Sequence, residues 1–382
     1  MVIASSTYRR PLPVTLTPFS SPEGRALFRE ALEDGAMESF FPLIEQFHTQ
    51  ADPAFCGLAS LVMALNALGV DPGRVWRGPW RWFSEELLDC CTPLEQVRKS
   101  GVSLEEVACL ARCNGADGQL FRPGSHGIDA FRSAVQLATC STDRVLIASY
   151  TRVTLGQTGG GHFSPVGGYH SGRDLALLLD VARFKYPPHW VPLSTLYAAT
   201  EDIDPESQRS RGWLMLQKRN APSAVTHFLI CKDGIGIKDT VQQLLVTHGE
   251  SLREQPHTTL ESVLHASATA FEASGLLARL QFRAPQTPEH ASLLAALESA
   301  LSALPLYQLA ANSIGPERAI PLVAWLLATP SHLWSALPSP LAHDILSLLD
   351  PDNMPPQLAT EITLLRSQVE FLLEHAKPTH CH

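Results

Sequence analysis

The apolar residues change their spacing along the chain, and this change constrains the fold more than any other feature of the sequence. Pro22 opens a helical stripe that Gly35 ends, and a second stripe opens at Cys56 and stops before Gly69. From Val145 onward the pattern becomes that of short strands. Strands are expected at 145–150, 162–169, 175–181 and 213–216. Helices followed by a run of strands predict an α+β fold.

Two segments after the second stripe have the residues of a helix capping box. Thr92 is followed by Glu95, and Ser103 by Glu106, so each hydroxyl can accept from the backbone N–H three residues on. The two boxes predict short helices at 93–100 and 104–113.

A polar stretch at residues 218–223 separates these patterns from a third one. Beyond it the composition shifts to Leu, Ala, Glu and Gln, and prolines divide the apolar helical stripes. Helices are expected at 258–281, 288–303, 318–328, 339–349 and 356–376. We therefore predict a mixed domain over 1–220 and a mostly helical domain over 221–382, in line with roughly 100–200 residues per domain.

The charge balance limits what the chain can bind. Lys and Arg number 29 against 38 Asp and Glu, which gives a net charge of −9 and disfavours non-specific binding to nucleic acid or to an anionic membrane. No signal-peptide pattern and no membrane-spanning apolar run are visible. The eight cysteines lack the paired spacing of a structural zinc site. These features predict a cytoplasmic protein with reduced cysteines.

Cys56 stands at the expected start of an apolar helix, behind a loop that contains Gln50. A helix N-terminus has free N–H groups and a partial positive charge, and both favour a thiolate over a thiol. The same N–H groups, with the side-chain amide of Gln50, would form an oxyanion hole. This arrangement predicts a nucleophilic cysteine.

A base and its partner come from two of the expected strands. His162 begins one strand directly after three glycines, where the backbone is uncrowded. Asp180 is the single charged residue in the apolar segment 175–181, and a buried carboxylate needs a partner. On neighbouring antiparallel strands Asp180 would fix the tautomer of His162 and stabilise its imidazolium. Cysteine, histidine and aspartate in this chain order are typical of papain-like enzymes.

Each of these residues also has an ordinary structural interpretation. A cysteine on an apolar helix is often a buried core residue. Asp180 can pair with Arg183 instead, and the glycines before His162 can form a simple hairpin. Only the combination of the three residues favours catalysis over these alternatives.

Four segments in the front half of the chain have distinctive amino-acid sequences. They read Asp-Pro-Gly-Arg at 71–74, Gly-Pro-Trp-Arg-Trp-Phe at 78–83, Leu-Asp-Cys-Cys at 88–91 and Asp-Val-Ala-Arg-Phe-Lys-Tyr-Pro-Pro-His-Trp at 180–190. With these segments, residues 8–220 resemble the phytochelatin synthase family. The resemblance implies a papain-like fold for the front domain and the activity of a γ-glutamylcysteine dipeptidyl transpeptidase, which builds metal-chelating peptides from glutathione for heavy-metal detoxification.

The resemblance also implies roles for the residues singled out above. Cys56 would attack the Cys–Gly carbonyl carbon of glutathione, while Gln50 and the Cys56 N–H hold the oxyanion. His162 would act as general acid and base, with Asp180 as its orienting partner. A γ-Glu-Cys thioester would remain and pass to the amine of a second glutathione or of a phytochelatin.

A second pocket, lined with cations, is implied for the anionic acceptor. The resemblance places Arg152, Lys185 and Tyr186 in this pocket, where an arginine can bind a carboxylate through two hydrogen bonds. Arg183 is implied beside Gln50, where it would shape the acyl site. The alternative for these side chains is an ordinary solvated surface.

Soft metal ions enter the predicted reaction through the substrate. The resemblance implies activation by Cd, Zn and similar ions, so the acceptor is expected to be a metal–glutathione thiolate complex. No organic cofactor is expected. Four cysteines match family positions and are candidate metal ligands: Cys90, Cys91, Cys109 and Cys113. Small buried thiols are the alternative interpretation of this group.

Two other functions remain open from the sequence. A hydrolase would use the same three residues but would only release glycine from glutathione or its S-conjugates, and a metal-binding sensor would keep the fold without catalysis. The expected partners are glutathione, phytochelatins and heavy-metal ions, and neither nucleic acid nor membranes. The oligomeric state stays open, with a homodimer as one option.

Overall fold

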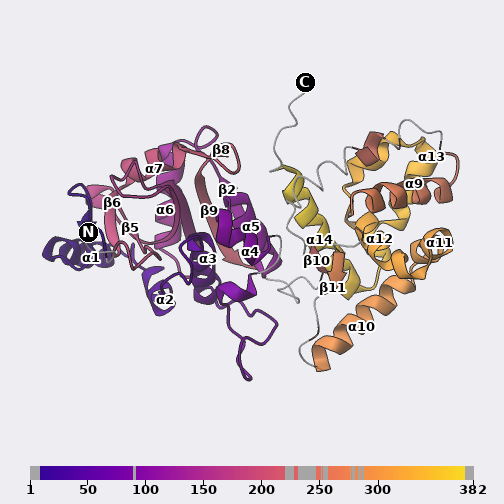
Figure 1. Ribbon diagram of the computed structural model, residues 1–382, viewed down its shortest axis with the longest axis horizontal. Coiled ribbons are helices and arrows are strands. Elements are labelled where there is room, and N and C mark those ends of the chain that lie inside the picture. Colours follow the sequence, from indigo (N-terminus) through magenta and orange to yellow (C-terminus); the bar gives the residue numbers. More distant parts are fainter. Residues whose placement is uncertain are drawn as a thin grey trace, which may run out of the picture. The chain divides into compact units, whose positions relative to one another are not determined.

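A computed structural model describes residues 9–88, 92–219, 228–230, 247–250, 252, 257–275, 277, 280–282, 285 and 288–374. Contacts within the chain divide it into two units. One comprises Met1–Asp89 with Leu94–Ala224, and the other comprises Cys90–Pro93 with Val225–His382. Figure 1 shows both units, with most of their helices and strands labelled.

A seven-stranded antiparallel sheet forms the centre of the first unit (Figure 1). The strands lie in the order β1-β6-β5-β4-β3-β9-β2, and each pairs antiparallel with its neighbours. Their bounds are β1 Thr17–Pro18, β2 Ala116–Phe121, β3 Arg144–Thr151, β4 Gly161–His170, β5 Leu175–Leu178, β6 His189–Pro192 and β9 Gly212–Lys218. Two short strands, β7 (Ile203–Asp204) and β8 (Arg209–Ser210), pair separately. The mixed α and β architecture predicted from the sequence is confirmed for this unit.

The helices expected in the front half are present as α1 (Pro22–Glu33), α3 (Cys56–Ala67), α4 (Leu94–Ser100) and α5 (Leu104–Cys113). The Ser103–Glu106 capping box of α5 is formed in both directions. One expected strand is shorter than predicted. β5 ends at Leu178 rather than at residue 181. The N–H of Leu179 still donates to the carbonyl oxygen of Pro165 in β4 at 3.0 Å, but Pro165 has no N–H to return the bond, so the ladder stops there.

Several elements of the first unit were not expected from the sequence: α2 (Phe40–Glu45), β2, α6 (Ile128–Thr139), β6 and α7 (Leu193–Glu201). β2 illustrates the reason. It contains Asp117 and Gly118, which are poor strand formers, yet all six of its residues pair with β9. Pairing with a buried neighbour overrides the weak local preference.

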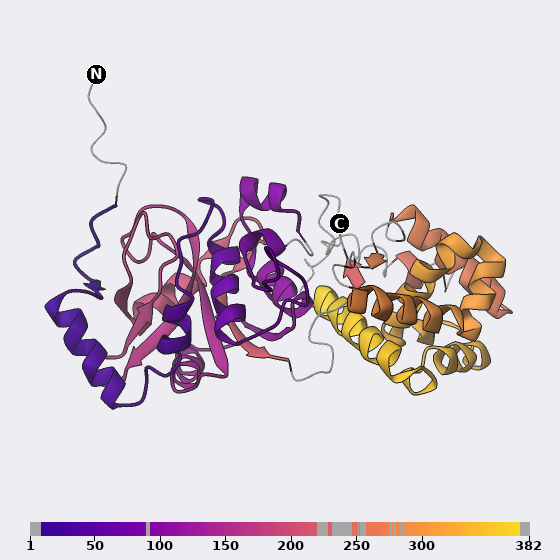
Figure 2. The same ribbon diagram turned by 90° about the horizontal axis from the view of Figure 1, so that it is seen from below.

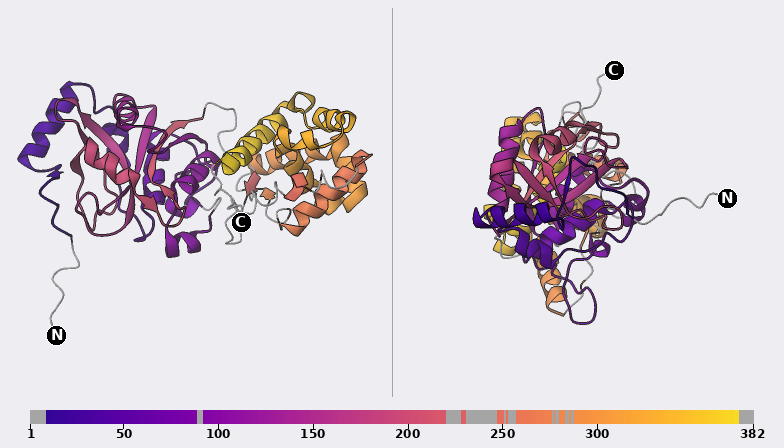
Figure 3. Two further views of the ribbon diagram at one scale, coloured as in Figure 1. Left: turned by 90° about the horizontal axis from the view of Figure 1, so that it is seen from above. Right: turned by 90° about the vertical axis from the view of Figure 1, so that its left-hand side faces the viewer.

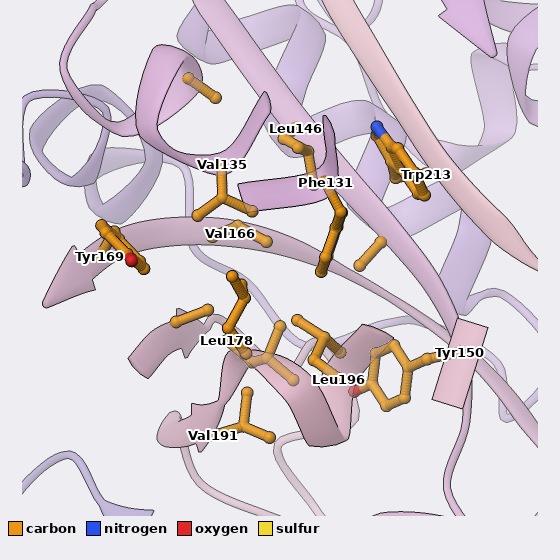
Figure 4. Packing of buried hydrophobic residues seen from close by; sticks show 14 of the residues in the cluster. Phe131, Val135, Leu146, Tyr150, Val166, Tyr169, Leu178, Val191, Leu196 and Trp213 are labelled. Carbon is orange, nitrogen blue, oxygen red and sulfur yellow. The ribbon is translucent and has the colours of Figure 1, made fainter. Parts of the chain in front are cut away.

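Helices cover both faces of this sheet (Figure 2, Figure 3). On one face, α6 and α7 pack against the central strands, and Figure 4 shows Phe131, Leu146 and Trp213 in this core. On the other face lie α3 and α5, where a Cβ added to Gly118 would touch Leu214 and the carbonyl of Ala108. Trp213 and Leu214 therefore face different helix layers, as alternation along a strand requires.

The second unit is mostly helical, as predicted. Its helices are α9 (Leu260–Ala273), α10 (Pro288–Ser302), α11 (Pro305–Ile314), α12 (Pro316–Ala328), α13 (Ser339–Leu348) and α14 (Pro356–Glu374), and β10 (Phe228–Ile230) pairs with β11 (Leu280–Phe282). The helix expected over 258–281 is too long, because it ends before Gly275, whose φ of +72° breaks it.

Among the described residues, no single helix has both the length and the apolar composition needed to cross a membrane. One pair, His290–Ser302 with Pro305–Ile314, meets these criteria only when taken together, with a bend of 80° between them.

Candidate active site

Cys56 is the first residue of α3, as the sequence predicts. Phe55 precedes the helix and supplies no capping side-chain hydrogen bond within the described residues, so the first N–H groups stay available. The thiol is not in a disulfide, and Cys56 is partly exposed.

His162 and Asp180 lie side by side, although 18 positions separate them in the sequence. The Nε2 atom of His162 is 2.9 Å from Oδ1 of Asp180, and both residues are buried. Asp180 lies just beyond β5 rather than within it, and its Oδ1 also accepts the backbone N–H of Ala182 at 2.9 Å. Because Nε2 faces the carboxylate, Nδ1 is the ring atom left for Cys56.

The charges of this site support one another. Burial raises the pKa of the Cys56 thiol, but the charge and hydrogen bond of His162, with the backbone N–H of Phe163 and the charge of Arg152, together outweigh burial, so the pKa lies below its ordinary value. Burial lowers the pKa of His162 and is the largest single effect, but the charge and hydrogen bond of Asp180 together with the charge of Cys56 outweigh it, and the pKa is raised. Both shifts favour a thiolate paired with an imidazolium.

Arg152, which the family resemblance implies in the acceptor pocket, lies against the carboxylate of Asp180. Its guanidinium is buried against Asp180, with Nη1 2.9 Å from Oδ2 and Nη2 donating to Oδ1 at 3.0 Å. Burial alone would raise the pKa of Asp180, but His162 and Arg152 together hold it well below its usual range. The charge of Arg152 is thus balanced by the carboxylate of Asp180. Asp180 pairs with Arg152 and His162, and not with Arg183.

The other residues implied for the acceptor pocket lie around the same network. Tyr186 is buried, and its hydroxyl oxygen accepts a hydrogen bond from the backbone N–H of Thr158 at 2.8 Å. The guanidinium of Arg152 lies over the aromatic ring of Tyr186, 5.1 Å from the centre of that ring. Lys185 is half-buried, and its Nζ would lie 2.8 Å from a Cβ added to Gly159. Burial, followed by the charge of Arg152, lowers the pKa of Lys185.

Arg183 is exposed and stacks on Phe47, with its guanidinium 4.8 Å from the ring centre. It lies at the loop that leads to Cys56, because Phe47 and Gln50 both belong to that loop. Lys185 and Arg183 are therefore the more accessible of the cations predicted to bind substrate.

Gln50 is buried in the loop before α3, but its side chain is already engaged. Its Nε2 donates to the carbonyl oxygens of Asp52 at 2.8 Å and Pro53 at 2.9 Å. Oε1 finds no hydrogen-bond partner among the described residues. A role as oxyanion donor would require one of these two loop bonds to be exchanged for the substrate oxygen. The backbone N–H of Gln50, bonded to the carbonyl of Val181 at 3.1 Å, ties the loop to the segment after Asp180.

The predicted cysteine metal site finds little support. Cys109 is disulfide-bonded, so not all cysteines are reduced as expected, and Cys113 is buried in the same helix. A disulfide sulfur is not the thiolate ligand that a soft metal requires. Cys90 and Cys91 lie outside the described residues. Across the parts of the chain that the structure describes, no group of three or more His, Cys, Asp or Glu side chains is placed to hold a metal.

Sequence reasoning missed two residues of the buried network, Gln157 and His189. Gln157 accepts from Arg152, and its Nε2 is 3.1 Å from Nε2 of His189. Both are buried. The sequence offers one signal for His189, its place between Pro188 and the apolar strand residues Trp190 and Val191, where a polar side chain needs a partner.

A cysteine at a helix start, coupled to a histidine that a carboxylate orients, is the arrangement of enzymes that form a covalent thioester. The comparisons with known proteins define the chain further. A family model described as phytochelatin synthase matches residues 7–213. The chain belongs to this family, as the four distinctive segments of its sequence indicate.

Curated relatives match about three fifths of the chain. Glutathione gamma-glutamylcysteinyltransferase 1 of Arabidopsis thaliana is 51% identical over 230 residues, which cover 60% of this chain and 47% of the relative. Glutathione gamma-glutamylcysteinyltransferase of Schizosaccharomyces pombe is 45% identical over 225 residues, 58% of this chain and 54% of the relative. The chain thus spans about half the length of these relatives.

Proposed function

We propose that this chain is a cysteine-dependent acyltransferase with a papain-like catalytic unit. It would cleave glycine from glutathione and transfer γ-Glu-Cys to a second glutathione or to a phytochelatin. The observation that carries the proposal is the 2.9 Å contact of His162 with Asp180, beside a Cys56 thiol whose pKa is lowered. The names of the relatives supply the substrate and the transferred group.

The first half-reaction follows from the charges of the resting site. The Cys56 thiolate attacks the Cys–Gly carbonyl carbon, and the N–H groups at the start of α3 stabilise the oxyanion. The His162 imidazolium gives its proton to the departing glycine amine as the C–N bond breaks. A γ-Glu-Cys thioester remains on Cys56, and the imidazole of His162 is neutral.

The second half-reaction uses the same histidine as a base. The α-amine of the acceptor attacks the thioester carbon, the neutral His162 takes a proton from this amine, and the C–S bond breaks to restore the thiolate. The acceptor is anionic, and Lys185 and Arg183 are the cations placed to bind its carboxylates. Arg152 stabilises the site from within.

Cd or Zn would take part as a component of the substrate. Thiolates of glutathione bind soft ions tightly, so the acceptor in this proposal is a metal–glutathione complex, and no organic cofactor is needed. We place this reaction in the cytoplasm as part of the proposal, because glutathione is kept reduced there.

The products of the reaction test the proposal. Incubation of the protein with glutathione and Cd should yield glycine and (γ-Glu-Cys)₂-Gly, separated and identified by mass spectrometry. Cys56→Ser should lower product formation by about a thousandfold or more. Cys140→Ser, which changes an exposed thiol after α6, is the matched control and should leave the rate unchanged.

Other outcomes would contradict this proposal in distinct ways. Glycine with γ-Glu-Cys as the sole peptide product would identify a hydrolase. Tight Cd binding without glycine release would identify a sensor. Full activity of Cys56→Ser would remove Cys56 as the nucleophile.

A further inference from the structure

Two buried side chains continue the catalytic network beyond Arg152, and the proposed reaction assigns them no part. Gln157 follows β3 in a loop whose backbone folds back, with the Gln157 N–H bonded to the carbonyl of Arg152 at 2.9 Å. His189 begins β6 and is fully buried. Their side chains form a continuous line from His189 through Gln157 and Arg152 to Asp180.

The chemistry of each atom fixes the direction of these hydrogen bonds. The carbonyl oxygen of Pro187 can only accept, so Nδ1 of His189, 2.8 Å away, carries the proton. In a neutral ring Nε2 is then an acceptor, and it takes an N–H of Gln157 at 3.1 Å. The amide oxygen of Gln157 must face the guanidinium of Arg152, because a guanidinium has no acceptor. Only one orientation of Gln157 satisfies both neighbours.

The line ends on the carboxylate that orients His162. Arg152 approaches Asp180 with two nitrogens: Nη2 donates to Oδ1 at 3.0 Å, and Nη1 lies in ion-pair contact with Oδ2 at 2.9 Å. Oδ2 accepts no hydrogen bond among the described residues, so the carboxylate is held by the Oδ1 bond and by the attraction of the two charges. A hydrogen bond from Nη1 of Arg152 to the amide oxygen of Gln157 holds the guanidinium in this orientation. The orientation of Asp180, and with it the position of Oδ1 relative to His162, therefore depends on the hydrogen bond between Arg152 and Gln157.

We propose that Gln157 and His189 are positioning residues, which hold Arg152 against Asp180 and thereby set the fraction of Cys56 present as thiolate. This inference deepens the proposed function, because it concerns the same thiol and rests on Cys56 being the nucleophile. It adds that the reactivity of the sulfur is set by a neutral histidine that four intervening side chains separate from it.

The surroundings keep His189 neutral. Burial lowers its pKa, the charge of Asp180 acts in the opposite direction, and the charges of Arg152 and His162 lower it further. A proton on Nε2 would face the N–H of Gln157 instead of accepting from it, and the line of hydrogen bonds would break at this point.

The test uses the reactivity of Cys56 with iodoacetamide as a function of pH, followed by peptide mass spectrometry in a Cys140→Ser background. This readout needs neither glutathione nor metal, so its result is independent of whether the chain is a transferase or a hydrolase. His189→Leu removes the acceptor, whereas His189→Gln can return an acceptor near the former Nε2. Thermal unfolding followed by circular dichroism reports whether each variant is folded.

We expect His189→Leu to raise the midpoint of the alkylation profile by about one pH unit, which is about a tenfold loss of thiolate on the acid side with the same plateau at high pH. His189→Gln should return most of this shift. A folded His189→Leu with the wild-type midpoint would overturn the proposal, and so would a His189→Gln variant with the same shift as His189→Leu.

Gln157→Glu keeps the shape of the side chain. If His189→Leu does not fold, this variant tests the same hydrogen bonds between His189, Gln157 and Arg152. Its second carboxylate oxygen faces Nε2 of His189, and its charge competes with Asp180 for Arg152, so the midpoint should rise. Gln136→Glu makes the same change at an exposed position of α6 and should leave the midpoint unchanged. A folded Gln157→Glu with the same profile as Gln136→Glu would also overturn the proposal.

Discussion

At the scale of single residues, the site is a balanced group of four charges. In the resting ion pair Cys56 and Asp180 are negative, and His162 and Arg152 are positive. Burying one charge is costly, and burying balanced, hydrogen-bonded charges is much less so. This balance explains why Arg152 is buried against Asp180 instead of lining an open pocket for substrate.

The pH dependence of catalysis should reveal the role of Asp180. The pKa of Cys56 is lowered and that of His162 is raised, so activity should rise with pH as the thiol ionises and fall as the imidazolium loses its proton. Asp180→Asn removes the charge that raises the pKa of His162, so the alkaline limb should move to lower pH. The value of kcat/KM for glycine release should fall by about a hundredfold or more.

Asp174→Asn is the matched control for this prediction. Asp174 also pairs with an arginine, Arg132, but at the surface, and its left-handed backbone with φ of 50° suits asparagine. It should keep the wild-type pH profile. An Asp180→Asn variant that is folded and has an unshifted alkaline limb would contradict the role assigned to Asp180.

At the scale of elements, three neighbouring pieces of the sheet bring the site together. Arg152 follows β3, His162 lies in β4, and Asp180 follows β5, and these strands are adjacent in the sheet. Register pairs Tyr150 with His162, and a shift in register between Val166 and Gly168 adjusts β5 against β4. The site depends on this register as much as on the residues themselves.

The start of α3 has to approach the sheet and α5 closely, and Gly57 permits this. A Cβ on Gly57 would lie 2.3 Å from Cγ2 of Val102 and 3.1 Å from Cγ2 of Val107. Gly57→Ala should therefore displace Cys56, lower activity and reduce stability by about 1–3 kcal/mol in denaturant unfolding. Adding Val102→Ala should restore part of both losses, because it removes the closest contact.

Gly127→Ala is the control for the effect of replacing a glycine by alanine where no close contact results. Gly127 precedes α6, and a Cβ there would meet nothing within 4 Å, so activity should stay at the wild-type level. If Gly57→Ala matched Gly127→Ala in activity and stability, close packing at the start of α3 would not be required.

At the scale of the whole molecule, the site and the family match belong to one unit. The match covers residues 7–213. All of these residues except Cys90–Pro93 belong to the first unit, which is formed by Met1–Asp89 and Leu94–Ala224. The second unit has its own buried core, which includes Phe271, Trp325 and Ile362. All the residues assigned to the reaction lie in the first unit.

Two separate cores predict two separate unfolding events. Differential scanning calorimetry of the full chain should show two transitions. A chain truncated after Arg219 should unfold in one transition and should keep the pH profile of Cys56 alkylation. A single transition in the full chain, or loss of folding on truncation, would show that the units depend on each other.

The sequence by itself determined the helices with strong stripes and caps, the two-part organisation of their patterns, the family, and the candidate residues Cys56, His162 and Asp180. These features depend on neighbours close in sequence or on long distinctive segments, so they can be seen without coordinates. β2 and the early end of β5 could not be seen in this way, because pairing across the sheet decides them.

The tertiary structure alone decided what surrounds the carboxylate of Asp180. Arg152 and Asp180 are 28 positions apart, and Gln157 and His189 are 32 apart, so no local pattern connects them. Strand register and the loops after β3 and β5 bring these side chains into the buried interior, where each must find a partner. That requirement turned an arginine expected at a substrate pocket into part of the catalytic network and added a glutamine and a histidine behind it.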